Sequence, residues 1–202
     1  MAQERSDLVG GSTMYDVNQR ARGPTDIDLT VRAYRPDGDR HSYGVALDAL
    51  DSGRAMWPRS EFDPGHFTAS GFVASPDGKA VLLIHHGKLD RWLQPGGHIE
   101  ACDALVEDAV RREVFEETGV GDLQRLGSSL VRIDAHIIPE RGSEPEHTHI
   151  DLAMGFIAPS DAIGPLDEVK DARWVRFEDL DAYDVDTGVL GGVDALRRLL
   201  AG

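Results

Sequence analysis

A short acidic stretch of the chain has the spacing expected of a metal site. Glu113, Glu116 and Glu117 follow one another closely, and at about 100° per residue on a helix their carboxylates share one face. That face also carries apolar side chains, namely Val106, Ala109 and Val110. Crowded carboxylates beside an apolar surface repel one another and lose hydration, so a cation among them would relieve both effects. Oxygen ligands without thiolates favour Mg²⁺ or Mn²⁺.

A single helix has to hold these carboxylates. The apolar periodicity predicts it over about residues 104–118, with Asp103 as its N-cap and Gly119 as its C-terminal stop. The preceding loop contains Trp92 and the glycines at 96 and 97. An alternative stays open, in which Glu116 and Glu117 extend past the apolar stripe into solvent and bind no metal.

Several predicted strands surround this helix in the sequence. Residues 66–75 and 80–86 are rich in β-formers, and the Pro76–Lys79 segment supplies a hairpin turn between them. Further strands are expected near residues 126–138, 148–158 and 172–177, and helices near 178–183 and 193–200. Mixed strands with two substantial helices predict a layered α/β or α+β domain.

The N-terminal quarter of the chain has a different character. Residues 1–24 are polar and lack sustained periodicity, so they are interpreted as a flexible lead. Apolar residues between 27 and 34 and between 45 and 50 predict two short helices, separated by a Pro-Asp-Gly turn at 36–38. We therefore expect a lead (1–24), a helical cap (25–62) and a main domain (63–202).

The segment from Gly96 to Val120 resembles the Nudix box, G-x5-E-x7-R-E-U-x-E-E-x-G-U, where U is aliphatic. The second half, from Arg112 to Val120, matches every fixed position. The first half departs twice, because Asp103 replaces a glutamate and eight residues rather than seven separate it from Arg112. The preceding run from Trp92 to Gly97 is similar to the family's W-x-x-P-G-G approach.

This resemblance implies an α/β fold, a Nudix-type α/β/α sandwich with a mixed sheet, here with an N-terminal helical extension. It also implies a Mg²⁺-dependent pyrophosphohydrolase, with Mn²⁺ as a substitute, that cleaves the diphosphate linkage of a nucleoside diphosphate derivative by attack of water at phosphorus. By resemblance, Glu116 and Glu117 are the principal metal ligands and Glu113 is a ligand or the general base. The carbonyl of Gly97 completes the metal site, and Arg112 orients the carboxylates.

Other polar residues are candidates for substrate binding or for a further acidic group. Those expected to contact the substrate are Lys88, Arg91, His98 and His149. The family often takes a further ligand or base from a later loop, and the candidates here are Glu140, Glu144, Glu146 and Asp151. His147, His149 and Asp151 alternate, so in a strand they share a face. Such a face could bind a metal, meet a phosphate or form a polar edge turned to solvent.

Composition narrows the class of partners. The formal charge of −15 would repel a phosphate backbone, which argues against duplex nucleic acid as a partner. The start of the chain has no apolar signal region, and no apolar run is long enough to span a membrane. We therefore expect a cytoplasmic protein that acts on a small diphosphate compound, and a homodimer is compatible with the sequence.

Two rival functions use the same fold. One is a catalytically inactive, ligand-sensing regulator, which usually lacks one or more of the box glutamates. The other is isomerisation of isopentenyl diphosphate, which is disfavoured because Cys102 does not lie in the expected active-site segment. Retention of Glu113, Glu116 and Glu117 favours the hydrolase, and the sequence does not name its substrate.

Overall fold

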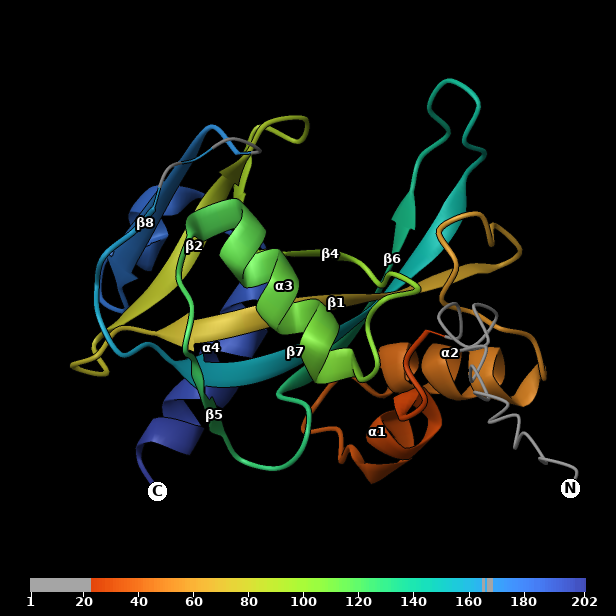
Figure 1. Ribbon diagram of the computed structural model, residues 1–202, viewed down its shortest axis with the longest axis horizontal. Coiled ribbons are helices and arrows are strands. Elements are labelled where there is room, and N and C mark those ends of the chain that lie inside the picture. The colour runs from red at the N-terminus through yellow and green to blue at the C-terminus, as the bar shows by residue number, and fades with distance from the viewer. Residues whose placement is uncertain (1–22, 165, 167–168) are drawn as a thin grey trace, which may run out of the picture.

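A mixed β-sheet forms the centre of the computed structural model, which describes residues 23–164, 166 and 169–202. Within that part of the chain, eight strands form one sheet whose main path runs β3-β2-β1-β7-β5 (Figure 1). Beyond this path, β4 pairs with β1, β6 with β7, and β8 with β2. The strands are β1 (Gly65–Ala74), β2 (Ala80–His86), β3 (Arg91–Leu93), β4 (Gly96–His98), β5 (Gln124–Leu126), β6 (Arg132–Ile138), β7 (His147–Ile157) and β8 (Asp171–Arg176).

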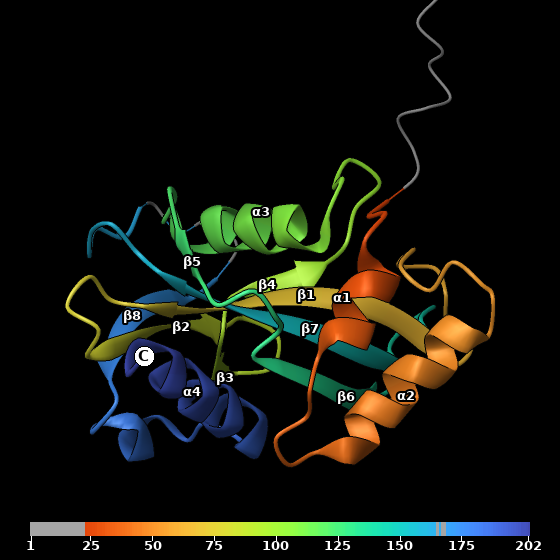
Figure 2. The same ribbon diagram turned by 90° about the horizontal axis from the view of Figure 1, so that it is seen from below.

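Helices cover both faces of this sheet. In Figure 2, α3 (Val106–Thr118) lies on one face and α4 (Thr187–Leu200) on the opposite one. The helices α1 (Ile27–Ala33) and α2 (Arg40–Asp51) lie beside β6 and β7, and a short 3-10 helix, η2 (Leu180–Tyr183), precedes α4. The predicted α/β architecture is therefore confirmed.

Alternation along β1 supplies both hydrophobic layers, because successive side chains of a strand point to opposite faces. Phe67 and Val73 join the core beneath α3, whereas Phe72 joins the core beneath α4. Gly71 lets α3 approach closely, since a Cβ there would lie 2.8 Å from a methyl of Val114. On the other face, Gly192 makes room for the ring of Phe72.

The N-terminal helices belong to the same core as the sheet. Ile27 and Val31 of α1 and Ala46 of α2 are buried in the cluster that includes residues of β6 and β7. The hydroxyl of Ser42 also accepts the backbone N–H of Ala135 at 3.0 Å. The division of the chain near residue 62 stays a prediction, and residues 1–22 of the predicted lead lie outside the described residues.

Three predicted elements differ from the structure. The expected loop that carries Trp92 and the glycines at 96 and 97 contains two short strands, β3 and β4. The single strand expected over 126–138 is divided into β5 and β6, because the chain turns at Gly127, whose φ is +69°. Helix α4 begins at Thr187, before the expected 193, because Asp186 caps it by accepting the N–H of Val189 at 2.9 Å. Glycines in the first turns of α4 have low helix propensity, so the sequence pattern did not indicate this start.

None of the helices in the described part of the chain has the length and apolar character needed to span a membrane.

Candidate active site

The carboxylate helix α3 is fixed at both ends. Its N-terminus begins at Val106, whose N–H is bound at 2.9 Å by the carboxylate of Asp26, from the segment before α1. Asp108 accepts the N–H of Leu105 at 3.0 Å. At the other end, Gly119 adopts a left-handed conformation with φ of +68°, as predicted for the helix stop. The expectation that Asp103 caps the helix is wrong, because its carboxylate is occupied elsewhere.

Asp103 pairs with Arg112 instead. Its two carboxylate oxygens accept from Nε and Nη2 of Arg112 at 3.1 and 2.9 Å, and one of them also accepts the N–H of Glu100 at 2.7 Å. Asp103 is only 4% exposed, so this two-point contact holds a buried charge. Asp103 therefore contacts Arg112 even though its side chain is shorter than that of glutamate and the box contains one extra residue.

Arg112 also gathers the box glutamates. Its Nη1 donates to Glu113 at 2.8 Å and to Glu116 at 2.9 Å, and its Nη2 donates to the carbonyl of His98 at 2.8 Å. Burial opposes the charge, but the hydrogen bonds to Asp103 and Glu113 raise the pKa of Arg112. This guanidinium thus remains a cation that ties α3 to the end of β4.

The glycine pair in β4 allows close contact with the carboxylates. Glu117 is buried and accepts the N–H of Gly96 at 2.9 Å. A Cβ on Gly97 would lie 2.6 Å from Oε2 of Glu113, so only glycine fits there without moving that carboxylate. The Glu116 side chain is 42% exposed. The alternative in which both Glu116 and Glu117 extend into solvent is therefore wrong for Glu117.

These donors fit a hard divalent cation. Glu117 and Glu113 of α3 lie against the glycine pair of β4, and Glu116 shares Arg112 with Glu113. The side-chain donors of these three residues are oxygens, with no thiolate or imidazole among them. Mg²⁺ and Mn²⁺ prefer such ligands.

A second polar layer lies on the α4 side of the sheet. Asp151 of β7 is buried, and it accepts from Ser70, from Thr68 at 3.1 Å and from Gln94 at 3.4 Å. Burial raises the pKa of Asp151, although the Ser70 hydroxyl acts against that shift. Asp151, one of the candidates for a further acidic group, is therefore a buried residue whose carboxylate is hydrogen-bonded to its neighbours in the sheet.

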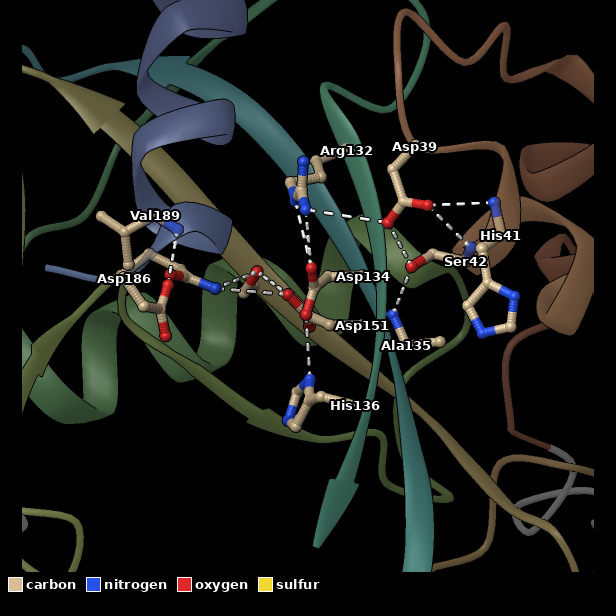
Figure 3. Close-up of polar contacts among 12 residues, drawn as sticks. Asp39, His41, Ser42, Arg132, Asp134, Ala135, His136, Asp151, Asp186 and Val189 are labelled. Carbon is tan, nitrogen blue, oxygen red and sulfur yellow. Dashed lines mark hydrogen bonds and ion pairs between the residues drawn. The ribbon is translucent and has the colours of Figure 1, made fainter.

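Figure 3 shows how the neighbouring strand continues this layer. Asp134 of β6 accepts from Arg132 at 2.8 Å and from His136 at 3.0 Å. The hydrogen bond from His136 is the main reason that the pKa of Asp134 falls to about 2. Arg132 also lies 3.9 Å from Asp39 at the start of α2, so the network joins the N-terminal helices to the sheet.

The other predicted acidic candidates lie in the loop between β6 and β7. Glu144 forms an ion pair with Arg59 at 2.9 Å, and this contact lowers the pKa of Glu144. Glu140 and Glu146 are exposed.

The predicted substrate-binding residues fall into two groups. Lys88 is exposed in the turn between β2 and β3, and Arg91 begins β3, 3.9 Å from Asp186. His98 and His149 instead lie side by side, with ring centroids 5.2 Å apart. Desolvation lowers the pKa of His98 to about 4 and that of His149 to about 2, so neither ring supplies a positive charge to a phosphate at neutral pH.

The alternating polar residues of β7 do not form a solvent-facing edge. This strand is internal, since β1 pairs along one side and β5 and β6 along the other. Its register places His149 opposite His66 of β1, a residue that the sequence analysis passed over. The signal available was the alternation of His66, Thr68 and Ser70, which marks a polar face within an otherwise apolar strand.

Comparison with known proteins agrees with this geometry. The NUDIX domain model matches residues 64–192. A NUDIX-family hydrolase from Clostridium perfringens superposes with a TM-score of 0.53 at 26% identity, over 67% of this chain and 97% of its own. The NUDIX domain of Shewanella oneidensis NrtR, solved with ADP ribose, gives a TM-score of 0.50 at 21% identity, over 66% and 87%. A NUDIX hydrolase from Nitrosomonas europaea gives a TM-score of 0.50 at 21% identity, over 65% of this chain and 88% of its own.

No curated protein sequence matches the chain, so the assignment depends on the family model, the solved structures and the box itself. The family model spans more than half of the chain and includes the carboxylate helix and the glycine pair. The Clostridium perfringens hydrolase is similar over nearly its whole length. The chain therefore belongs to the Nudix family of pyrophosphohydrolases.

Proposed function

We propose that this protein hydrolyses the diphosphate linkage of a nucleoside diphosphate derivative, such as a nucleoside triphosphate or an ADP-ribose-like compound. The observation that carries the proposal is the set of contacts that fix the box glutamates: Arg112 holds Glu113 and Glu116, and the glycine pair of β4 lies against Glu113 and Glu117. The ADP ribose bound in the Shewanella oneidensis domain supports including that ligand among the substrates to be tested.

Mg²⁺ is the proposed cofactor, and Mn²⁺ is its expected substitute. Glu116 and Glu117 would hold it, together with Glu113 if that residue is not the base, and with the carbonyl of Gly97. When bound, such a cation neutralises phosphate oxygens and lowers the pKa of a coordinated water. It would also offset the repulsion between an anionic substrate and a protein of formal charge −15.

The protein's own residues have separate roles in this proposal. Arg112 keeps the carboxylates in fixed positions, and a carboxylate that is not a ligand accepts a proton from the attacking water. Lys88 and Arg91 are proposed to meet the substrate's phosphates, and the neutral ring of His98 offers a hydrogen bond. His149 faces other histidines, and we assign it below to a different site.

The proposal is tested by screening diphosphate compounds with the full-length protein. Nucleoside triphosphates, ADP-ribose, dinucleoside polyphosphates and nucleotide sugars are incubated with Mg²⁺ or Mn²⁺, and release of phosphate or nucleotide is measured. Turnover of at least one compound, dependent on the added cation, is expected. Binding without any turnover would instead favour the ligand-sensing regulator.

The carboxylate assignment is tested by the variants Glu116→Gln and Glu117→Gln. Each removes a negative ligand, so kcat should fall by ~10²-fold or more, as for loss of one electrostatic stabiliser in other enzymes. The melting temperature without metal should stay level or rise because carboxylate repulsion is relieved. The control is Glu178→Gln, an exposed glutamate paired with Arg176, which should retain the wild-type rate. Wild-type rates in both site variants at low Mg²⁺ would contradict the assignment.

A further inference from the structure

A cluster of histidines lies apart from the carboxylates, where the first residues of β1 and β7 run side by side. The register of this parallel pair sets His66 opposite His149, and His147 lies two residues earlier on β7. One ring nitrogen from each of these three residues lies within 4.8 Å of the other two. We propose that His66, His147 and His149 bind a first-row transition-metal cation of the Zn²⁺ type, at a site distinct from the proposed Mg²⁺ site.

The tautomers of two rings leave Nε2 as the nitrogen available to a metal. Nδ1 of His66 lies 2.8 Å from the carbonyl of Glu61, and Nδ1 of His147 lies 2.7 Å from the carbonyl of Pro145. A carbonyl oxygen only accepts, so each Nδ1 carries the hydrogen and each Nε2 carries a lone pair. Ligating histidines almost always have such an outer partner for the second nitrogen.

His66 supplies an independent sign of a ligand. The residue is fully buried, and its Nε2 has no hydrogen-bond partner among the described residues. An unsatisfied buried acceptor is costly, and native proteins rarely keep one without a function. A cation bound to Nε2 would satisfy it.

The surroundings favour a metal over a proton. His147 is also buried, and the ring of Phe62 covers it edge-on at 5.0 Å between centroids. Desolvation lowers the pKa of His66, which keeps its ring in the neutral form that a metal requires. Three imidazoles suit Zn²⁺, Co²⁺, Ni²⁺ or Cu²⁺, whereas Mg²⁺ prefers oxygen.

The cluster is close to tetrahedral dimensions. Zn–N bonds of about 2.0–2.1 Å place tetrahedral ligand atoms roughly 3.4 Å apart, so nitrogens within 4.8 Å need to draw together by at most about 1.5 Å. Three protein ligands leave a fourth position for water, or for His98, whose ring lies 5.2 Å from that of His66. The backbone carbonyl of His98 accepts from Arg112, so β4 contacts the surroundings of both sites.

Co²⁺ is the probe that separates the two metal sites. The full-length protein, freed of metal by a chelator, is titrated with Co²⁺ while visible absorption is recorded. Nitrogen-bound, four-coordinate Co²⁺ absorbs far more strongly than octahedral, oxygen-bound Co²⁺, so one equivalent should give the strong band. Zn²⁺ should displace the band and raise the melting temperature, since it binds the folded state preferentially.

The variants His147→Ala and His149→Ala should lose the band. Their Co²⁺ affinity should fall by more than the ~10–100-fold that loss of an outer partner costs. Melting curves without metal are measured for each, and the comparison uses the variant that keeps a cooperative transition. His66 is not substituted because it is fully buried.

Two controls decide between this site and others. His136→Ala changes a ring 5.8 Å from that of His149, but this histidine is paired with Asp134, so it should keep the band. Glu116→Gln with Glu117→Gln removes the proposed Mg²⁺ ligands and should also keep it. The absence of a strong band in the wild type, its persistence in both His147→Ala and His149→Ala, or its loss in the glutamate variant alone would overturn the proposal.

Discussion

Arg112 joins several groups of the candidate active site. It contacts the carboxylates of Asp103, Glu113 and Glu116 and the carbonyl of His98. The Arg112 side chain is 18% exposed, so these contacts are shielded from solvent screening. We propose that a residue placed in this way positions the reacting groups without touching the substrate.

Replacement of Arg112 should therefore affect both stability and catalysis. Arg112→Ala leaves Asp103 buried without its cation, which should cost about 3 kcal/mol of unfolding free energy. Arg112→Lys keeps the charge but not the two-point contact, so its loss of stability should be smaller. In both variants kcat should fall by roughly 10²-fold through misplaced carboxylates. Urea unfolding and steady-state kinetics measure these effects, and Arg173→Ala, an exposed arginine, is the control. Unchanged kcat in Arg112→Lys would show that the two-point contact does not matter.

The histidines make stability depend on acidity. In the unfolded chain a histidine has a pKa near 6.5, whereas in the folded protein the pKa of His98 falls to about 4. Between these values the unfolded state binds more protons, so stability decreases as the pH falls from 6.5 toward 4. The groups facing His98 are the histidines His66, His147 and His149, together with Arg59 and Glu144. His136 acts in the opposite direction, since Asp134 raises the pKa of His136.

Urea unfolding across this pH window, in chelator, checks the prediction. The unfolding free energy of the wild type should decrease as the pH falls from 6.5 toward 4, and that of His98→Gln should decrease by less over the same window. The comparison is made as the slope of unfolding free energy against pH. A slope that is equal in the two proteins would show that His98 does not contribute to the acid sensitivity.

At the scale of the elements, the N-terminal segment is joined directly to the carboxylate helix. The carboxylate of Asp26 accepts the first N–H of α3, and the N–H of Thr25 donates to the carbonyl of Ala104 at 3.1 Å. A carboxylate at a helix N-terminus satisfies a free donor and interacts favourably with the helix dipole. The helical cap therefore contributes to the placement of the glutamates.

Asp26→Ala should lower the unfolding free energy by about 1 kcal/mol, the usual cost of losing a helix cap. Asp28→Ala is a matched control, because that carboxylate is exposed and pairs with Arg32 on the surface of α1. Thermal and urea unfolding compare the two. An equal decrease in unfolding free energy from both substitutions would mean that the hydrogen bond from the Val106 N–H to Asp26 does not stabilise the protein.

For the whole molecule, the predicted lead and the helical cap should differ in their importance. The first stretch lacks apolar periodicity, whereas α1 and α2 bury Ile27, Val31 and Ala46 in the main core. Gly23 lies against the ring of Trp57, so the informative deletion ends at residue 22. That deletion should leave the melting temperature nearly unchanged.

Deletion through residue 57 should instead destabilise the protein severely, since it exposes the apolar surface that these helices cover. Differential scanning calorimetry of the two truncated chains measures the contrast. Similar losses in both would place the boundary within the first 22 residues.

Much of the candidate site was determined by the sequence alone. The spacing of Glu113, Glu116 and Glu117, the preceding glycines and the helix stop at Gly119 are local features, and a helix with 3.6 residues per turn converts such spacing directly into a shared face. The approximate positions of the longer strands along the chain, the α/β architecture and the resemblance to the Nudix family followed from the same local patterns. The predicted roles of the individual site residues stay predictions.

Only the tertiary structure decided which distant residues meet. Asp103 pairs with Arg112 rather than capping the helix, because a long arginine side chain reaches back across the turns that the sequence motif describes. Asp26 reaches α3 across 80 residues of sequence. His66 meets His147 and His149 through the register of β1 with β7. Pairing of strands far apart in the chain depends on packing of the whole sheet, so no local spacing in the sequence specifies it.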